Sequence, residues 1–197
     1  STADNNTAVG YNSLLSNTTG ASNVAVGALA LDANTSGTNN VAIGYQSLSD
    51  NSTGGDNLAL GMNALSSNTT ASDNTAVGRS ALTLNTTGNS NVAVGRAALL
   101  LNTTGTRNTS VGSSSTDANT TGNYNTALGY NSLTANTTAS YNTALGDTSL
   151  SANSTGEHNT AIGQGSLQTN TTADNNTSVG SASLNQNSTG ASNTAVG

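Results

Sequence analysis

The chain of 197 residues has a formal net charge of −6, and only 6% of its residues are charged. Its three basic residues are arginines, which argues against a nucleic-acid partner because affinity for phosphates needs a clustered basic face. The absence of cysteine excludes a disulfide scaffold and thiolate metal ligands. Apolar residues make up 32% of the chain, too few for an ordinary globular core, and no apolar run approaches the roughly 20 residues of a membrane helix.

A 17-residue repeat organises the whole chain. The motif Asn-Thr-Ala-Val-Gly at residues 6–10 recurs every seventeen residues up to Asn193, without insertion or deletion. Eleven complete units fill residues 6–192, residues 1–5 end a preceding unit, and residues 193–197 begin another. We number the unit positions 1 to 17 from the first Asn. A strict period of this kind predicts a single repeat array over residues 1–197, cut from a longer array.

Positions 2 to 4 of each unit predict a short β-strand. They hold small or β-branched residues, as in Val41-Ala42-Ile43, whereas the Gly, Asn and Thr of the unit disfavour a helix. Alternation places positions 2 and 4 on one face and the Ala of position 3 on the other, so both faces are apolar. One face fills the interior of a coil and the other packs on something else. We assign the position-4 side chains to the interior.

A second short strand is expected at positions 8 to 10, where position 9 is Leu in ten of eleven units and Thr116 in the remaining one. One unit cannot bury its own apolar stripe, so its stability must come from the neighbouring units. The predicted structural core combines positions 4 and 9 and comprises Val9, Leu14, Val26, Leu31, Ile43, Leu48, Leu60, Leu65, Val77, Leu82, Val94, Leu99, Val111, Leu128, Leu133, Leu145, Leu150, Ile162, Leu167, Val179 and Leu184.

Glycine and asparagine predict the corners of the coil. Gly at position 5, and Gly or Ala at position 15, permit tight bends, and the Ala copies indicate that position 15 does not need a positive φ. Asn at positions 1 and 12 suits corners because it tolerates the left-handed region and bonds to nearby backbone. Stacked coils would align these amides in ladders about 4.8 Å apart. The position-12 ladder comprises Asn17, Asn34, Asn51, Asn68, Asn85, Asn102, Asn119, Asn136, Asn153, Asn170 and Asn187.

The same position-12 asparagines begin an Asn-Thr-Thr string, or a Ser variant of it, that matches the acceptor for N-linked glycans. Turn chemistry in a chain rich in Asn and Thr produces the same string, and stacked coils leave little room for a branched glycan on each coil. A structural ladder is the preferred interpretation, and a glycan on the Asn or on the neighbouring Thr stays open. Regular Thr at positions 2 and 14 also fits an ice-binding face, although Thr is equally a good strand residue.

Residues able to support catalysis or metal binding are few and scattered. His158 is the only histidine, and the nine acids share no common unit position, so we predict a solvated turn residue and no catalytic, cofactor or metal site. The one adjacent glycine pair, Gly54-Gly55, forms no phosphate-binding loop because the lysine that such a loop needs is absent. An enzyme is therefore the least favoured class.

The string Asn-Val-Ala-Ile-Gly-Tyr-Gln-Ser at residues 40–47 resembles the head repeats of YadA-like trimeric autotransporter adhesins. The longer unit, Asn-Thr-Ala-Val-Gly-Tyr-Asn-Ser-Leu-x-x-Asn-Thr-Thr-Gly, resembles repeats of phage and bacterial tail-fibre-like surface proteins. The resemblance covers the whole chain and is most specific in the first eight positions, although the adhesin repeats are commonly shorter than 17 residues. It implies a left-handed parallel β-roll, with three chains side by side, that projects from a cell or virion to bind a surface.

We therefore predict an all-β fold, a parallel β-solenoid with one coil per repeat and no helices. The predicted function is a structural or adhesive segment of an extracellular fibre, the shaft or head of a surface filament, at a cell surface or on a virion appendage. We expect a homo-oligomer, either a trimer or a filament bundle, through the second apolar strand face, with a host surface or glycan as a further partner. The alternatives are a module that binds ice or carbohydrate through a Thr/Asn ladder, and a glycan-bearing filament scaffold.

Overall fold

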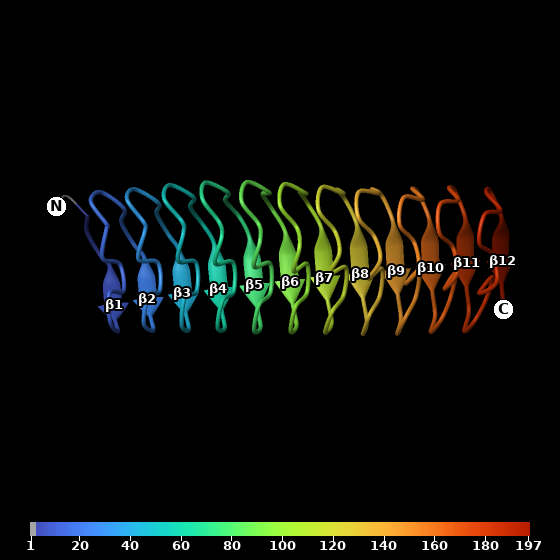
Figure 1. Cartoon of the computed structure of the whole chain (residues 1–197), viewed down its shortest axis with the longest axis horizontal. Coiled ribbons are helices and arrows are strands. Elements are labelled where there is room, and N and C mark those ends of the chain that lie inside the picture. Colours follow the sequence, from blue (N-terminus) through green and yellow to red (C-terminus); the bar gives the residue numbers. More distant parts are fainter. Residues whose placement is uncertain (1–2) are drawn as a thin grey trace.

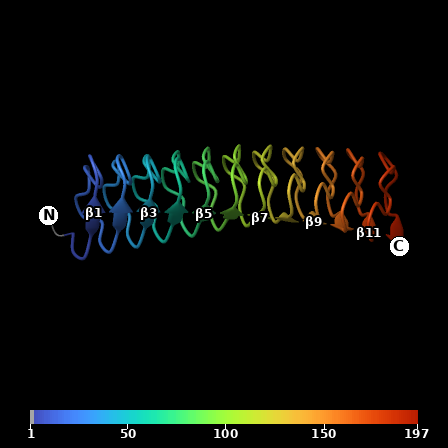
Figure 2. The ribbon, with the colours of Figure 1, turned by 90° about the horizontal axis from the view of Figure 1, so that it is seen from below.

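A computed structural model describes residues 3–197 as one all-β solenoid. Each 17-residue unit forms one coil, and the coils follow one another along a single axis from the N-terminus to the C-terminus (Figure 1). Figure 2 shows the same single row of coils after a quarter turn. The predicted fold class is confirmed: twelve parallel strands form one sheet in sequence order, and residues 3–197 contain no helix.

The strands occupy positions 2 to 4 of each unit, as predicted. Each pairs in parallel with the same positions of the next unit, for example Ala8 with Ala25, so equivalent residues stack in columns. This register follows from the constant unit length. The strands are β1 (Thr7–Val9), β2 (Val24–Val26), β3 (Val41–Ile43), β4 (Leu58–Leu60), β5 (Thr75–Val77), β6 (Val92–Val94), β7 (Thr109–Val111), β8 (Thr126–Leu128), β9 (Thr143–Leu145), β10 (Thr160–Ile162), β11 (Thr177–Val179) and β12 (Thr194–Val196).

The interior of each coil is formed by positions 3, 8 and 9. The Ala or Ser of position 3 is fully buried from β2 to β11. The position-9 leucines that were expected in the core lie there: eight are fully buried, and Leu14 and Leu184 at the two ends are partly buried against the same clusters. The eight buried ones are Leu31, Leu48, Leu65, Leu82, Leu99, Leu133, Leu150 and Leu167.

The position-4 side chains lie on the outer face of the sheet, which corrects their assignment to the interior. Leu60 and Leu128 are 40% and 45% exposed, whereas the alanine before each of them is fully buried. The interior is narrow, so only Ala or Ser fits opposite the position-9 leucine, and the larger side chains of the strand point outward. The other position-4 side chains are likewise half-buried or exposed: Val9, Val26, Ile43, Val77, Val94, Val111, Leu145, Ile162, Val179 and Val196.

Positions 6 to 11 form a turn rather than the second strand expected at positions 8 to 10. Positions 7 and 9 have positive φ, for example 58° at Ala97 and 51° at Leu99, so the backbone is not extended there. Position 9 still bonds to the next coil, since the backbone N–H of Leu99 donates to the Ser115 carbonyl at 3.1 Å. The left-handed region costs a leucine about 1–2 kcal/mol, and burial of its side chain offsets this by about 1.5–3 kcal/mol.

The left-handed corners do not lie at the asparagines of positions 1 and 12. Position 17 has positive φ in every coil, and Gly at position 5 has φ between 125° and 148°. Within residues 3–197, positions 1, 12 and 15 have no positive φ, which corrects the reason given for Asn there and agrees with the Ala copies at position 15. Position 5 needs Gly for a second reason: a Cβ on Gly44 would lie 2.7 Å from the carbonyl of Gly61 in the next coil.

The apolar interior is divided into two clusters by one polar coil. We number the coils from the unit that begins at Asn6. The first cluster runs through coils 2 to 6 (residues 23–107) and the second through coils 8 to 10 (residues 125–175). Between them, coil 7 (residues 108–124) carries Ser110, Ser115 and Thr116 at positions 3, 8 and 9, and all three are buried. The Ser110 hydroxyl donates to the Ser115 carbonyl oxygen at 2.7 Å, so this polar interior is internally hydrogen-bonded.

Candidate functional site

The candidate functional features are rows of equivalent side chains along the rod rather than a cleft. Within residues 3–197 there is no pocket and no group of three or more His, Asp or Glu side chains placed to hold a metal ion. The described part of the chain also lacks any helix long and apolar enough to span a bilayer.

The position-1 asparagines form a buried amide ladder. The backbone N–H of Asn91 donates to Asn74 Oδ1 at 2.9 Å, and its Nδ2 donates to the same oxygen at 3.2 Å. The same Nδ2 also donates to the Gly105 carbonyl at 2.9 Å. The backbone N–H to Oδ1 bond recurs at all eleven steps between Asn6 and Asn193, so each coil is tied to its neighbour through this column.

The position-12 asparagines form a second buried ladder beside the first. Asn102 Nδ2 donates to Asn85 Oδ1 at 2.8 Å and to the Gly105 carbonyl at 3.0 Å. That carbonyl therefore accepts from both ladders of its own coil. A Cβ added at Gly105 would lie 2.4 Å from Asn102 Oδ1, so this corner is tightly packed and must shift slightly in the units that hold Ala at position 15.

The geometry of the second ladder opposes the N-glycan interpretation of the Asn-Thr-Thr string. Nine of the eleven position-12 asparagines, from Asn34 to Asn170, are fully buried. Each of them uses Nδ2 in two hydrogen bonds, as Asn119 does with Asn102 Oδ1 at 2.8 Å and the Gly122 carbonyl at 3.1 Å. A sugar on this nitrogen would replace one donor and force a polar ring into the coil. The folded coil offers no access to it.

The two hydroxyl residues that follow this asparagine differ in their environment. At position 13, the Thr103 hydroxyl donates to the Thr120 carbonyl of the next coil at 3.0 Å, and this bond recurs through all ten steps of the column. Position 14 is exposed in every copy, and none of its hydroxyls makes a hydrogen bond to a described residue. We call these the position-14 row: Thr19, Ser36, Thr53, Thr70, Thr87, Thr104, Thr121, Thr138, Thr155, Thr172 and Thr189.

The outer face of the sheet is an uncharged apolar strip. Positions 1 to 4 hold no Asp, Glu, Lys or Arg in any of the twelve copies. Position 2 contributes Thr, Val or Leu, and position 4 contributes Val, Ile or Leu, with Val9 58% and Leu145 38% exposed. Such a continuous row of branched side chains on one side of a sheet is the part of this molecule most like a protein interface.

Sequence reasoning missed an aromatic column at position 17. Tyr124 and Tyr141 stack with ring centroids 5.0 Å apart, and Tyr141 stacks on His158 at 4.9 Å. Arg107 lies 5.3 Å from the centroid of Tyr124 and donates a hydrogen bond to its hydroxyl. In the sequence, this column is indicated by an arginine, two tyrosines and a histidine that follow one another at intervals of seventeen residues. Because the rings cover one another's faces, the column braces coils 6 to 9 and leaves ring edges to the solvent.

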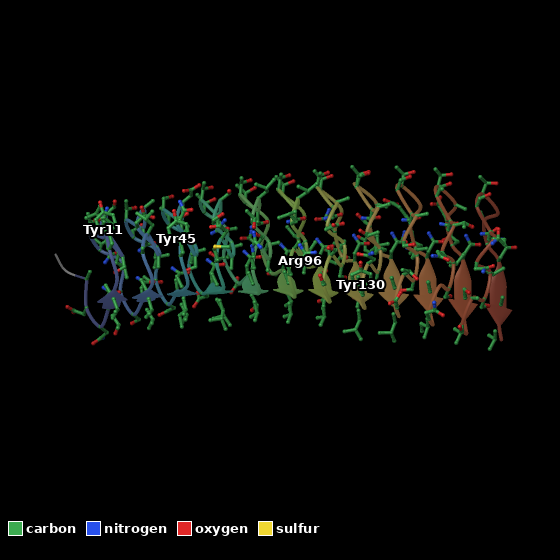
Figure 3. All side chains as sticks on the ribbon, turned by 60° about the horizontal axis from the view of Figure 1, so that its bottom comes forward. Tyr11, Tyr45, Arg96 and Tyr130 are labelled. Atoms are coloured by element: carbon green, nitrogen blue, oxygen red, sulfur yellow. The ribbon has the colours of Figure 1, made fainter. Side chains whose placement is uncertain are left out.

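Charge is segregated along the rod. Residues 74–116 contain all three arginines and no acid, whereas five acids precede this segment and four follow it. Two of the arginines, Arg79 and Arg96, occupy position 6, which is variable and mostly exposed. The three tyrosines labelled in Figure 3 occupy the same unit position.

The carboxyl group of Asp32, at position 10 of coil 2, has a raised pKa. Burial is the main cause, and the charge of Asp50 adds to the increase, while a hydrogen bond from the backbone of Asp32 opposes it.

The chain matches no family model, no curated protein and no solved structure. A functional assignment therefore depends on the columns described above and on what their chemistry allows.

Proposed function

We propose that this chain is a segment of a rigid extracellular fibre, of the adhesin or tail-fibre kind, in which the number of coils sets the length. The observation that carries the proposal is the pair of asparagine ladders, which links every described coil to the next without a break. Buried amides that are paired at each step resist bending, because opening one step leaves groups unpaired at about 1–3 kcal/mol each. A rod whose described coils contain no pocket suits a spacer or a presenting surface.

Lateral association of copies through the outer sheet face is the second part of the proposal. At about 4.8 Å per strand and roughly 10 Å across, twelve strands present about 550 Å² per chain. Two such faces together reach the roughly 1,000 Å² that a specific interface needs. Association through this strip desolvates no charge, and burial of the exposed Leu60 and Leu128 side chains contributes favourable free energy.

The resemblance of residues 40–47 to trimeric adhesin head repeats supports three chains around a common axis and a place at a cell surface or on a virion appendage. A filament bundle is the alternative arrangement of the same face. A host surface or glycan would then meet the variable exposed positions, where Arg96 and Tyr130 lie.

The test changes the outer face without touching the interior. The variant Leu60→Asp/Leu128→Asp places two charges on the strip, and Ser90→Asp is the control, at a position where Asp56 and Asp73 occur naturally. We expect sedimentation to show that the unmodified and control chains are oligomers of rods and that the double variant is a single rod with an unchanged circular dichroism spectrum. An unmodified chain that sediments as a monomer would contradict lateral association.

A further inference from the structure

The position-14 row is constrained in sequence although nothing in the fold constrains it. Its side chains are exposed in all eleven coils and their hydroxyls make no hydrogen bond to a described residue. Other exposed positions vary widely: position 6 includes Tyr, Met, Arg and Asp, and position 17 includes Ser, Asp, Arg and Tyr. Position 14 is nevertheless Thr in ten units and Ser in one.

The common feature of the row is the hydroxyl. If position 14 were constrained only by the backbone preference of β-branched residues, Val and Ile would also occur there and Ser36 would not. Val and Ile never occur at position 14. The remaining invariant positions each have a structural role: Gly at position 5 permits its φ, and Asn at positions 1 and 12 forms the ladders. A hydroxyl kept at the surface without an internal partner indicates something outside the fold that uses it.

We propose that the position-14 row is an acceptor row for O-linked sugars. Positions 12 to 15 carry no charged residue in any unit, so an ionic ligand finds no counter-charge there. In the same corner, the position-12 amide is buried and the position-13 hydroxyl is already bonded, as at Asn102 and Thr103. Thr104 and its equivalents, which are exposed, offer the one free nucleophile of this corner.

The modification is a glycosyl transfer from a nucleotide sugar. The threonine Oγ forms a bond to the anomeric carbon, the bond from that carbon to the nucleoside diphosphate breaks, and the hydroxyl proton passes to a base of the transferase. Neighbouring acceptors lie about 4.8 Å apart, one strand spacing, which favours short unbranched sugars over branched ones. With only 6% charged residues, the rod would gain much of its hydration from such a coat.

The acceptor row is separate from the outer sheet face. In the chain, four positions separate the acceptor row from the strand: positions 15 to 17 and position 1 of the next unit. The left-handed bend lies at position 17. The inference therefore goes beyond the proposed fibre, and its outcome does not depend on lateral association.

The test is mass spectrometry of the protein purified from the cells that produce it. We expect proteolytic peptides that contain position 14 to be heavier than their sequences by multiples of a sugar residue, and fragmentation to assign the sugars to position 14, including Thr87 and Thr104. In the variant Thr104→Val this site should lose its sugar, whereas the position-13 control Thr103→Val should keep the sugar on Thr104. Position-14 peptides with the masses of their unmodified sequences, or sugars on Asn102 instead, would overturn the proposal.

A second measurement tests the premise that the fold does not use these hydroxyls. In chains without sugar, Thr104→Val should leave the melting temperature unchanged, whereas Thr103→Val should lower it because the hydrogen bond to the Thr120 carbonyl is lost. An equal loss for both variants would give position 14 a structural role and remove the reason for the proposal.

Discussion

Coil 6 (residues 91–107) and coil 7 fill the same interior positions with different chemistry. Coil 6 has two alanines and Leu99 there, whereas coil 7 has Ser110, Ser115 and Thr116, and all six side chains are buried. The sheet is nevertheless continuous, since β6 pairs with β7 in the same register as every other pair. The interior thus tolerates polar residues when their hydroxyls are paired, as Ser115 is with Ser132 at 2.9 Å.

What does not change between the two coils is the pair of asparagine ladders. Asn108 bonds to Asn91 Oδ1 through its backbone N–H at 3.0 Å, and Asn119 bonds to Asn102 Oδ1 at 2.8 Å. The apolar clusters end on either side of coil 7, but these bonds pass through it. We infer that the ladders set the register of the coils and that the apolar interior adds stability within each cluster.

The largest effect is expected from removing a ladder residue in either coil. Asn102→Ala and Asn119→Ala should each lower the free energy of unfolding by about 2–4 kcal/mol, because buried donors and acceptors lose their partners. The two losses should be equal within error, since the ladder is the same in both coils. Urea unfolding followed by circular dichroism measures them, with the exposed Thr121→Ala as a control. A loss at Asn119 much smaller than at Asn102 would confine the ladder's role to apolar coils.

A somewhat smaller effect is expected when coil 6 is given one residue of coil 7. Leu99→Thr removes a buried leucine and adds a hydroxyl, and Ala93 offers that hydroxyl no partner. We expect a loss of about 2–3 kcal/mol, from lost apolar burial and an unpaired polar group. Thermal unfolding of this variant beside Leu99→Met, which keeps the interior apolar, provides the comparison. Equal stability of the two variants would mean that interior hydroxyls need no partner.

The converse change should stabilise the rod modestly. Ser110→Ala/Thr116→Leu gives coil 7 the apolar residues of its neighbours and joins the two clusters. The Ser110 hydroxyl also donates to Thr116 Oγ1 at 3.4 Å, so both members of that pair are replaced together. We therefore expect a gain of about 1 kcal/mol. Thr116→Leu alone is the control and should gain less, because Ser110 then keeps a hydroxyl in an apolar interior. A lower melting temperature for the double variant would show that the hydroxyl network is needed.

The smallest effect is expected from replacing the aspartate of position 10 by asparagine, which we compare in two coils. Burial raises the pKa of Asp32 in coil 2, so the native state disfavours its ionised form at neutral pH. Asp32→Asn should therefore raise the melting temperature slightly at pH 7, and this gain should vanish as the pH falls below the pKa of Asp32. The control is Asp117→Asn in coil 7, where Thr134 donates to the carboxylate at 2.6 Å. A gain at Asp32 that persisted in acid would exclude ionisation as its cause.

Much of this fold could be predicted from the sequence because identical units must stack in register. The period fixed the coil, and the small and β-branched residues of positions 2 to 4 located the strands. The inward face could not be assigned, because both faces are apolar and only the width of the coil selects Ala93 over Val94. The positive φ of the position-9 leucines could not be predicted either, because residues such as Leu99 rarely adopt it and only burial of the side chain stabilises it here.

The surface rows were partly readable from the sequence. Asn at positions 1 and 12 indicated the ladders because its side chain can donate and accept along a stack. The repeated Thr of position 14 was visible, but not that its hydroxyl is free while that of position 13 is bonded. That distinction depends on where each side chain points, which the residue type alone does not specify.

Native-state hydrogen exchange tests most directly whether the ladders hold the coils together independently of the apolar interior. The two groups to compare are the backbone N–H of Asn91 in coil 6 and of Asn108 in coil 7, which bond to equivalent amide oxygens. If the ladders set the register, the protection factors of these two N–H groups should agree within about tenfold. Exchange at Asn108 faster by about two orders of magnitude or more would identify coil 7 as a weak joint and contradict a continuous rod.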